Sequence, residues 1–319
     1  MADSYKTLSD LVTINQAGLA DIEVSDIFAD APLLRALAAG PSSDGTNHKY
    51  TKETGAPVVG FRAPNAGREN SKSADTLVTI ALKILDGSFA VDKAIADKFK
   101  KGPQAYIGKE SGRFLKAMFA AAELEILRGT ASGVSGAAAD GFTGLEDALA
   151  AVAHDMVLSA GGDTADGCGS IYMIRTNGDG ADCTIIGADK AGDGMIDIEI
   201  GDSITQRIED ASGKHYTGYW TPIQAWMGLQ IGSKYSVARM CNIDEAALVN
   251  DDLLFSMWEL FPETRKPNLL VMPGKIREWW RQSRTATNPT GAPAPTPVDF
   301  EGARVIATGS LSMTEDPVS

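Results

Sequence analysis

Residues 103–129 read PQAYIGKESGRFLKAMFAAAELEILRG, and this stretch predicts a single long helix from Pro103 to Arg128. Proline is favoured in the first turn of a helix, and Gly129 suits the position just after its end. At 1.5 Å per residue the helix is roughly 40 Å long, which exceeds most helices of globular proteins. We expect its apolar face to be largely buried against a β-rich segment after Gly169; that face holds Leu115, Phe119, Ala122 and Ile126.

The first 45 residues do not have the pattern of a compact domain and predict an extended arm over residues 1–45. Residues 23–39 have helical spacing, although Pro32 is expected to kink or split that helix. The run Gly-Pro-Ser-Ser-Asp-Gly at residues 40–45 then interrupts regular structure.

Residues 46–87 predict a long β-hairpin. Two extended runs, at residues 47–54 and 76–85, flank a polar tip that is rich in glycine and proline. A two-stranded hairpin with so little apolar content is not stable alone in water. We therefore expect it to project from the body and to lie on a neighbouring surface.

The rest of the chain mixes helix and strand patterns without an internal repeat. Helices are expected at residues 90–100, at residues 145–158, after Asp251 and from Pro273. Between Gly169 and Ile243 the pattern is that of strands with turns, and further strands are expected at residues 269–272 and 305–313. This mixture indicates an α+β fold.

The charge of the chain restricts its partners. The 319 residues include 42 acidic and 29 basic ones, for a formal charge of −13. Such a surface repels nucleic acid, so sequence-specific DNA binding is disfavoured. The negative charge is compatible with a container that must not bind its DNA tightly. Three scattered cysteines predict buried free thiols, and neither a signal peptide nor a membrane-spanning run is expected.

The sequence contains little that predicts chemistry. Only three histidines occur, and His154 beside Asp155 would point away from it on a helix. Two acidic glycine loops, at residues 177–182 and 189–194, lack the closing glutamate of an EF-hand and favour β-turns. We expect no catalytic, cofactor or metal site. The basic helix at residues 275–284 is expected to meet an acidic neighbour or water, and its two tryptophans to lie in a core or interface.

The order of these segments resembles the Hong Kong 97-type fold of tailed-bacteriophage major capsid proteins. Four stretches sharpen the resemblance, at residues 26–37, 170–180, 213–231 and 272–297. The resemblance implies an N-terminal arm (1–45), an E-loop hairpin (46–87), a P-domain with a spine helix (88–243, spine 103–128) and an A-domain with a C-terminal strand (244–319).

The resemblance also implies a function. The chain would be a major capsid protein that self-assembles through pentamers and hexamers into an icosahedral head around double-stranded DNA. It would belong to the virion and be assembled in the host bacterial cytoplasm. Because the hairpin begins near Thr46, a separate scaffolding protein is implied, together with a portal; a decoration protein is a further partner that the resemblance allows. A cellular encapsulin-like compartment and a hydrolase with a β-rich domain are the alternatives.

Candidate intersubunit contacts lie in the arm and the hairpin. The arm contributes Phe28, Leu33 and Leu34. The hairpin contributes Lys49, Lys52, Phe61, Arg62, Arg68 and Lys72. Some members of the family cross-link covalently through a hairpin lysine, but Lys49, Lys52 and Lys72 are more simply explained as solvated side chains.

Overall fold

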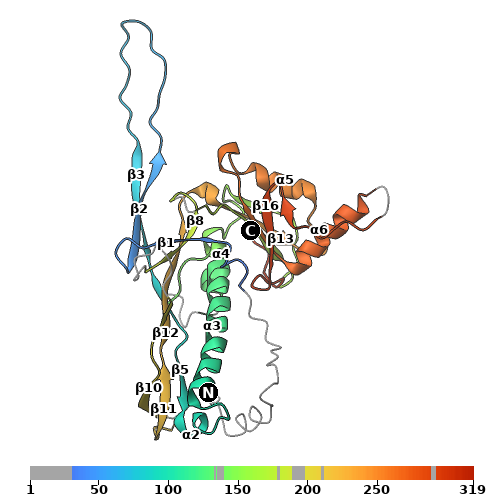
Figure 1. Cartoon of the computed structure of the whole chain (residues 1–319). Coiled ribbons are helices and arrows are strands. Elements are labelled where there is room, and N and C mark those ends of the chain that lie inside the picture. The colour runs from blue at the N-terminus through green and yellow to red at the C-terminus, as the bar shows by residue number, and fades with distance from the viewer. Residues whose placement is uncertain are drawn as a thin grey trace.

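The computed structural model describes residues 31–132, 134, 140–177, 180–188, 198–209, 212–288 and 292–319 (Figure 1). A long hairpin projects from one end, a long helix runs beside a ribbon of strands, and a compact α+β unit lies to one side. Phe28 and the first half of the helix expected at residues 23–39 lie outside the described residues.

The long helix is confirmed as α3, Pro103–Arg128. Gly102 precedes it with a φ of 86°, and Gly129 follows it with a φ of 54°, so both ends use backbone conformations that favour glycine. Its buried residues include Tyr106, Met118 and Ile126. Phe119, however, is 39% exposed and Leu115 only partly buried, so the expectation that this whole face is buried is wrong for the isolated subunit.

A ribbon of strands runs alongside α3 (Figure 1). Its upper sheet has the order β1-β8-β12-β4, and β9 also pairs with β12. The strands are β1 (Ala38–Pro41), β8 (Cys183–Gly187), β12 (Ile223–Ile231), β4 (Lys83–Asp86) and β9 (Ile198–Ile200). The lower sheet is β10 (Ile204–Glu209), β11 (His215–Thr221) and β5 (Phe89–Asp92). Pro222 separates β11 from β12, at the point where the chain changes sheets and no ladder N–H is needed.

The predicted hairpin is confirmed as β2 (Asn47–Gly55) paired with β3 (Ala74–Ala81). The extended run predicted at residues 76–85 divides at the buried Leu82, because residues after it pair with β12 as β4. At the base of the hairpin, the Tyr50 hydroxyl donates to the Ile231 carbonyl at 3.2 Å. The hairpin is therefore tied to the body at its base.

The side unit is built on a six-stranded sheet of order β15-β16-β14-β7-β13-β6. The strands are β15 (Asp299–Phe300), β16 (Ala303–Thr308), β14 (Leu269–Pro273), β7 (Gly169–Ile174), β13 (Val237–Ile243) and β6 (Val157–Ser159). Every residue of β7, β13 and β14 is buried. Helices α5 (Asp251–Glu259) and α6 (Gly274–Ala286) complete the unit. Its sheet pairing includes strands on both sides of residue 244, where the resemblance implied a domain boundary.

Two helices expected from the sequence are much shorter than predicted, and strand pairing takes up one end of each range. At residues 145–158 only α4, Leu145–Ala148, is helical, because Val157 onward pairs with β13. At residues 90–100 the first residues pair with β11 as β5, and α2 is only Lys93–Ala96. In the arm, residues 38–41 pair with β8 as β1 and are not helical. In each case pairing with a distant strand overrides local helical spacing.

Two buried carboxylates join distant parts of the chain. Glu123 on α3 is fully buried and accepts from the Leu33 amide at 2.8 Å, the Leu34 amide at 3.3 Å and the Ser310 hydroxyl at 2.9 Å. The Thr308 hydroxyl donates to the same carboxylate. The second is Glu315, which pairs with the buried Arg239 at 3.0 Å.

Replacing Glu123 by Gln tests the first of these junctions. The glutamine amide can accept at only one atom, and its NH₂ group would face donors, so we expect the free energy of unfolding to fall by about 2–3 kcal/mol. Glu259→Gln, at an exposed helical glutamate, is the control and should change it by less than about 0.5 kcal/mol. Urea denaturation of the unassembled subunit measures both, and an equal effect of the two would contradict this role of Glu123.

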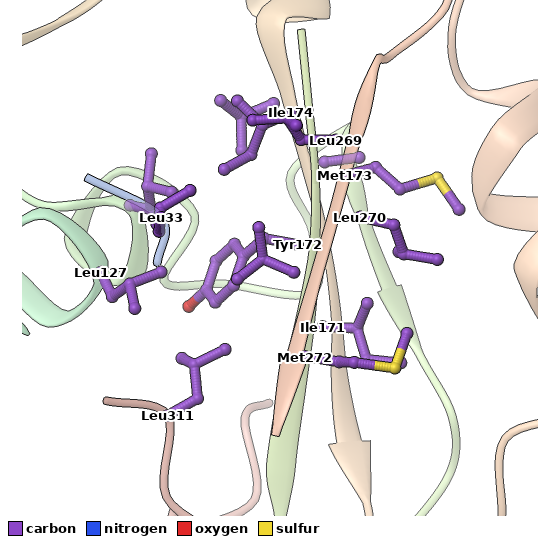
Figure 2. Packing of buried hydrophobic residues seen from close by; sticks show 14 of the residues in the cluster. Leu33, Leu127, Ile171, Tyr172, Met173, Ile174, Leu269, Leu270, Met272 and Leu311 are labelled. Carbon is purple, nitrogen blue, oxygen red and sulfur yellow. The ribbon is translucent and has the colours of Figure 1, made fainter. Parts of the chain in front are cut away.

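Tyr172 offers a second test, because its buried hydroxyl has no hydrogen-bond partner among the described residues. Figure 2 shows this hydroxyl directed toward the side where Leu127 and Leu311 lie. Tyr172→Phe removes a buried polar atom that makes no hydrogen bond, so stability should be unchanged or rise by up to about 1 kcal/mol. Tyr50→Phe, which removes a paired hydroxyl, should instead lower it. If Tyr172→Phe lowers the free energy of unfolding by more than about 1 kcal/mol in the same urea assay, the Tyr172 hydroxyl does have a hydrogen-bond partner.

Candidate functional site

The hairpin tip, residues 56–73, is the most exposed part of the described chain, and every one of its residues is exposed. Val58 is 71% exposed, Val59 is 84% exposed and Phe61 is fully exposed. Soluble monomers rarely leave such neighbouring apolar side chains in water, so the tip has the character of a contact surface.

The tip is organised by its own hydrogen bonds. Arg68 donates to the carbonyl oxygens of Val58 and Gly60, and the Ser71 hydroxyl donates to the Val58 carbonyl at 2.9 Å. Arg62 donates to the Ala66 carbonyl at 3.1 Å. These bonds tie the two sides of the tip together, so Arg62 and Arg68 shape the surface from which Phe61 projects.

The other candidate contact residues differ in exposure. Lys72 is exposed, Lys52 is partly exposed, and Lys49 lies 3.6 Å from Asp44 of the same subunit. Leu34 is partly buried. Leu33 is fully buried in the core of its own subunit, so the expectation that it contacts a neighbour is not supported for this residue.

A second surface, which sequence reasoning missed, is an apolar groove of about 610 Å³ beside α3, called here the α3 groove. Its apolar lining includes Leu34, Leu37, Leu85, Met118, Phe119, Ile185, Ile198 and Met227. Two basic side chains, Arg35 and Lys116, also line it. These residues come from segments far apart in the chain, so no local pattern could have revealed the groove.

The side unit is held by charge pairs within the subunit. Buried Arg239 donates to the Ser170 hydroxyl at 3.1 Å and to the Leu149 carbonyl at 3.0 Å, beside Glu315. Burial raises the pKa of Glu315, against the hydrogen bond from Ser170 and the charge of Arg239. This network attaches the C-terminal segment to the six-stranded sheet.

The predicted basic helix, α6, also bonds within its own subunit. Lys275 lies 3.1 Å from Glu245, Arg284 lies 2.9 Å from Asp251, and Arg281 lies 3.1 Å from Glu278. Trp280 is fully buried and donates to Asp251, so the expectation of a core role is confirmed for Trp280. The basic face expected to meet a neighbour or water thus has carboxylate partners within the subunit.

The residues considered for chemistry are not brought together. The His154 ring accepts from the Met156 amide, and exposed His215 lies 3.9 Å from Glu209. The three cysteines are buried free thiols as predicted, and burial raises the pKa of Cys183 to about 12. Among the described residues no cluster of His, Cys, Asp or Glu could hold a metal ion. Within the same residues no helix is both long and apolar enough to cross a membrane.

Comparisons with known proteins agree with this architecture. The family model described as Major capsid protein GP7 matches residues 22–318. A chain of bacteriophage Epsilon15, solved by cryo-EM, has a TM-score of 0.68 and 18% identity over 100% of this chain and 98% of that chain. No curated protein sequence was found to match.

Two further capsid structures are similar. The bacteriophage JBD30 capsid has a TM-score of 0.50 and 14% identity over 89% of this chain and 93% of that one. The cyanophage A-1(L) capsid has a TM-score of 0.51 and 12% identity over 71% of this chain and 97% of that one. These likenesses confirm the Hong Kong 97-type fold, and with a family model that spans residues 22–318 the chain belongs to the GP7 family of major capsid proteins.

Proposed function

We propose that this capsid subunit assembles through pentamers and hexamers into a closed icosahedral head around double-stranded DNA, with the hairpin of each copy docked on its neighbour. The observation that carries this proposal is the hairpin tip, where Val58, Val59 and Phe61 are exposed on a projecting element. A neighbour that covers them would remove this apolar surface from water.

The energetics favour a repeated contact. Burying one such side chain contributes roughly 1.5–3 kcal/mol before the entropy of ordering the tip is subtracted. Each subunit both gives and receives one hairpin in a closed ring, so modest contacts accumulate around the shell. The tie at Tyr50 and the hydrogen bonds within the tip lower the entropy cost, because the tip is partly organised before it docks.

The charge of the chain supports a container. With a formal charge of −13, the subunit surface does not favour tight binding of DNA, which would suit a genome that must later leave. We further propose a structural rather than catalytic role and assembly in the host bacterial cytoplasm. The proposed partners are a separate scaffolding protein and a portal, with a decoration protein as an optional further partner.

Replacing residues 56–73 by Asn-Gly tests the hairpin. Gly55 and Ala74 pair across the hairpin, so a two-residue turn can close the shortened strands. The variant should remain folded by circular dichroism and soluble, yet form no closed shells in sedimentation velocity and electron microscopy. Normal shells would show that the tip is dispensable, and an unfolded subunit would show that it belongs to the core.

A point variant separates the apolar contact from the loop itself. Phe61→Asp should leave the free energy of unfolding within about 0.5 kcal/mol of the parent, because the side chain is exposed, while the yield of closed shells should fall sharply. Val298→Asp, at a residue 68% exposed on the side unit, is the matched control and should assemble normally. Equal assembly of both variants would contradict a role for Phe61.

The encapsulin-like alternative makes a different prediction for the particle contents. Shells purified from cells that carry the phage should contain genome-length double-stranded DNA that resists nuclease until the shell is opened. Particles that hold a protein cargo and no such DNA would favour the cellular compartment.

A further inference from the structure

The α3 groove has apolar walls and a basic rim. Arg35 and Lys116 are both exposed, and neither forms an ion pair within the part of the chain that the structure describes. Phe119 lies beside them and is 39% exposed. An occupant that fits this surface must bring apolar side chains together with negative charge.

The segment just before Ala31, the first residue in the chain that lines the groove, combines apolar side chains with negative charge. Residues 21–30 read DIEVSDIFAD, with four acidic residues, no basic residue, and Ile22, Val24, Ile27 and Phe28 among them. The hairpin tip carries Arg62, Arg68 and Lys72 but only one acid, Glu69. Its net charge is therefore positive, like that of the groove's rim, and the two repel each other. Charge therefore favours residues 21–30 over a neighbour's hairpin as the occupant of the α3 groove.

The path of the chain also favours this occupant. The amides of Leu33 and Leu34 are bound by Glu123, which is one helical turn after Phe119 on α3. The five residues from Phe28 to Leu33 span at most about 18 Å when extended, which suffices to return to a site one turn away. A covalently attached segment has a high effective concentration at such a site.

We propose that residues 21–30 of the arm dock in the α3 groove of their own subunit, with Phe28 and Ile27 on the apolar lining and the acidic residues facing Arg35 and Lys116. This docking covers Phe119 and gives the arm a defined place beside the helix, and it replaces the expectation from the sequence that Phe28 contacts a neighbouring subunit. It concerns the subunit itself and does not depend on how the hairpin contacts a neighbour.

A photo-crosslinking experiment on the full-length subunit tests the proposal. Phe28 is replaced by the aromatic photo-reactive residue p-benzoylphenylalanine, and light and heavy isotope-labelled subunits are mixed before illumination, both unassembled and assembled. Mass spectrometry should find links to peptides containing residues 116–119 or 35–37, and only between peptides of the same isotope label. Mixed-label links, which would reveal a second copy as the occupant, or the absence of links at the groove would overturn the proposal.

Charge reversal supplies an independent readout. Arg35→Glu combined with Lys116→Glu should reduce the same-label links by about fivefold, and Asp26→Lys with Asp30→Lys in the same chain should restore them. Lys52→Glu with Lys72→Glu on the hairpin is the matched control and should leave the links unchanged. If the groove and hairpin variants behave alike, the ionic contact is refuted. Because links form within one subunit, a failure of shell assembly does not affect this result.

Discussion

The arrangement of this subunit depends on the hydrogen bonds that the carboxylate of Glu123 accepts. It lies fully buried on α3 and accepts from two amides of the N-terminal segment and from two hydroxyls at the end of the C-terminal strand β16. A buried charge is tolerated only when donors surround it, and here the donors come from both ends of the described chain. The long helix therefore fixes where β1 begins and where β16 ends.

From that junction the two sheet systems take opposite roles. The six-stranded sheet buries its three central strands completely, and Arg239 with Glu315 secures the C-terminal segment against it. In the ribbon beside α3, β8 is buried throughout but β10 is mostly exposed, and the hairpin that projects beyond it has a tip whose residues are all exposed. Stability thus resides in the side unit and along α3, while the projecting hairpin is left available for contact. This division suits a subunit that must fold before it assembles.

The parts that the sequence predicted are those set by local chemistry. Pro103 and Gly129 mark the ends of α3, and the glycine- and proline-rich tip between two extended runs marks the hairpin. The predictions were wrong where residues far apart in the sequence determine the local structure. Val157 has helical spacing but pairs with β13, and Phe119 matches an apolar stripe but lies in a groove left open by residues from several segments. Leu33 was predicted to be a surface contact because the sequence around it does not reveal its hydrogen bond to Glu123, which is 90 residues away.

The distribution of charge explains how one chain can stay soluble and still assemble. Residues 47–81 hold five basic and three acidic residues, whereas the remainder holds 24 basic and 39 acidic ones. Bodies of like charge repel one another, while a basic hairpin is attracted to an acidic neighbour. Exposed ion pairs contribute little individually, so in the proposed assembly each docking event stays weak and reversible until a ring of them closes. Reversible docking lets a misplaced subunit dissociate. The exposed apolar surface is also confined to a short loop, whereas a long exposed sheet edge would pair with any other strand.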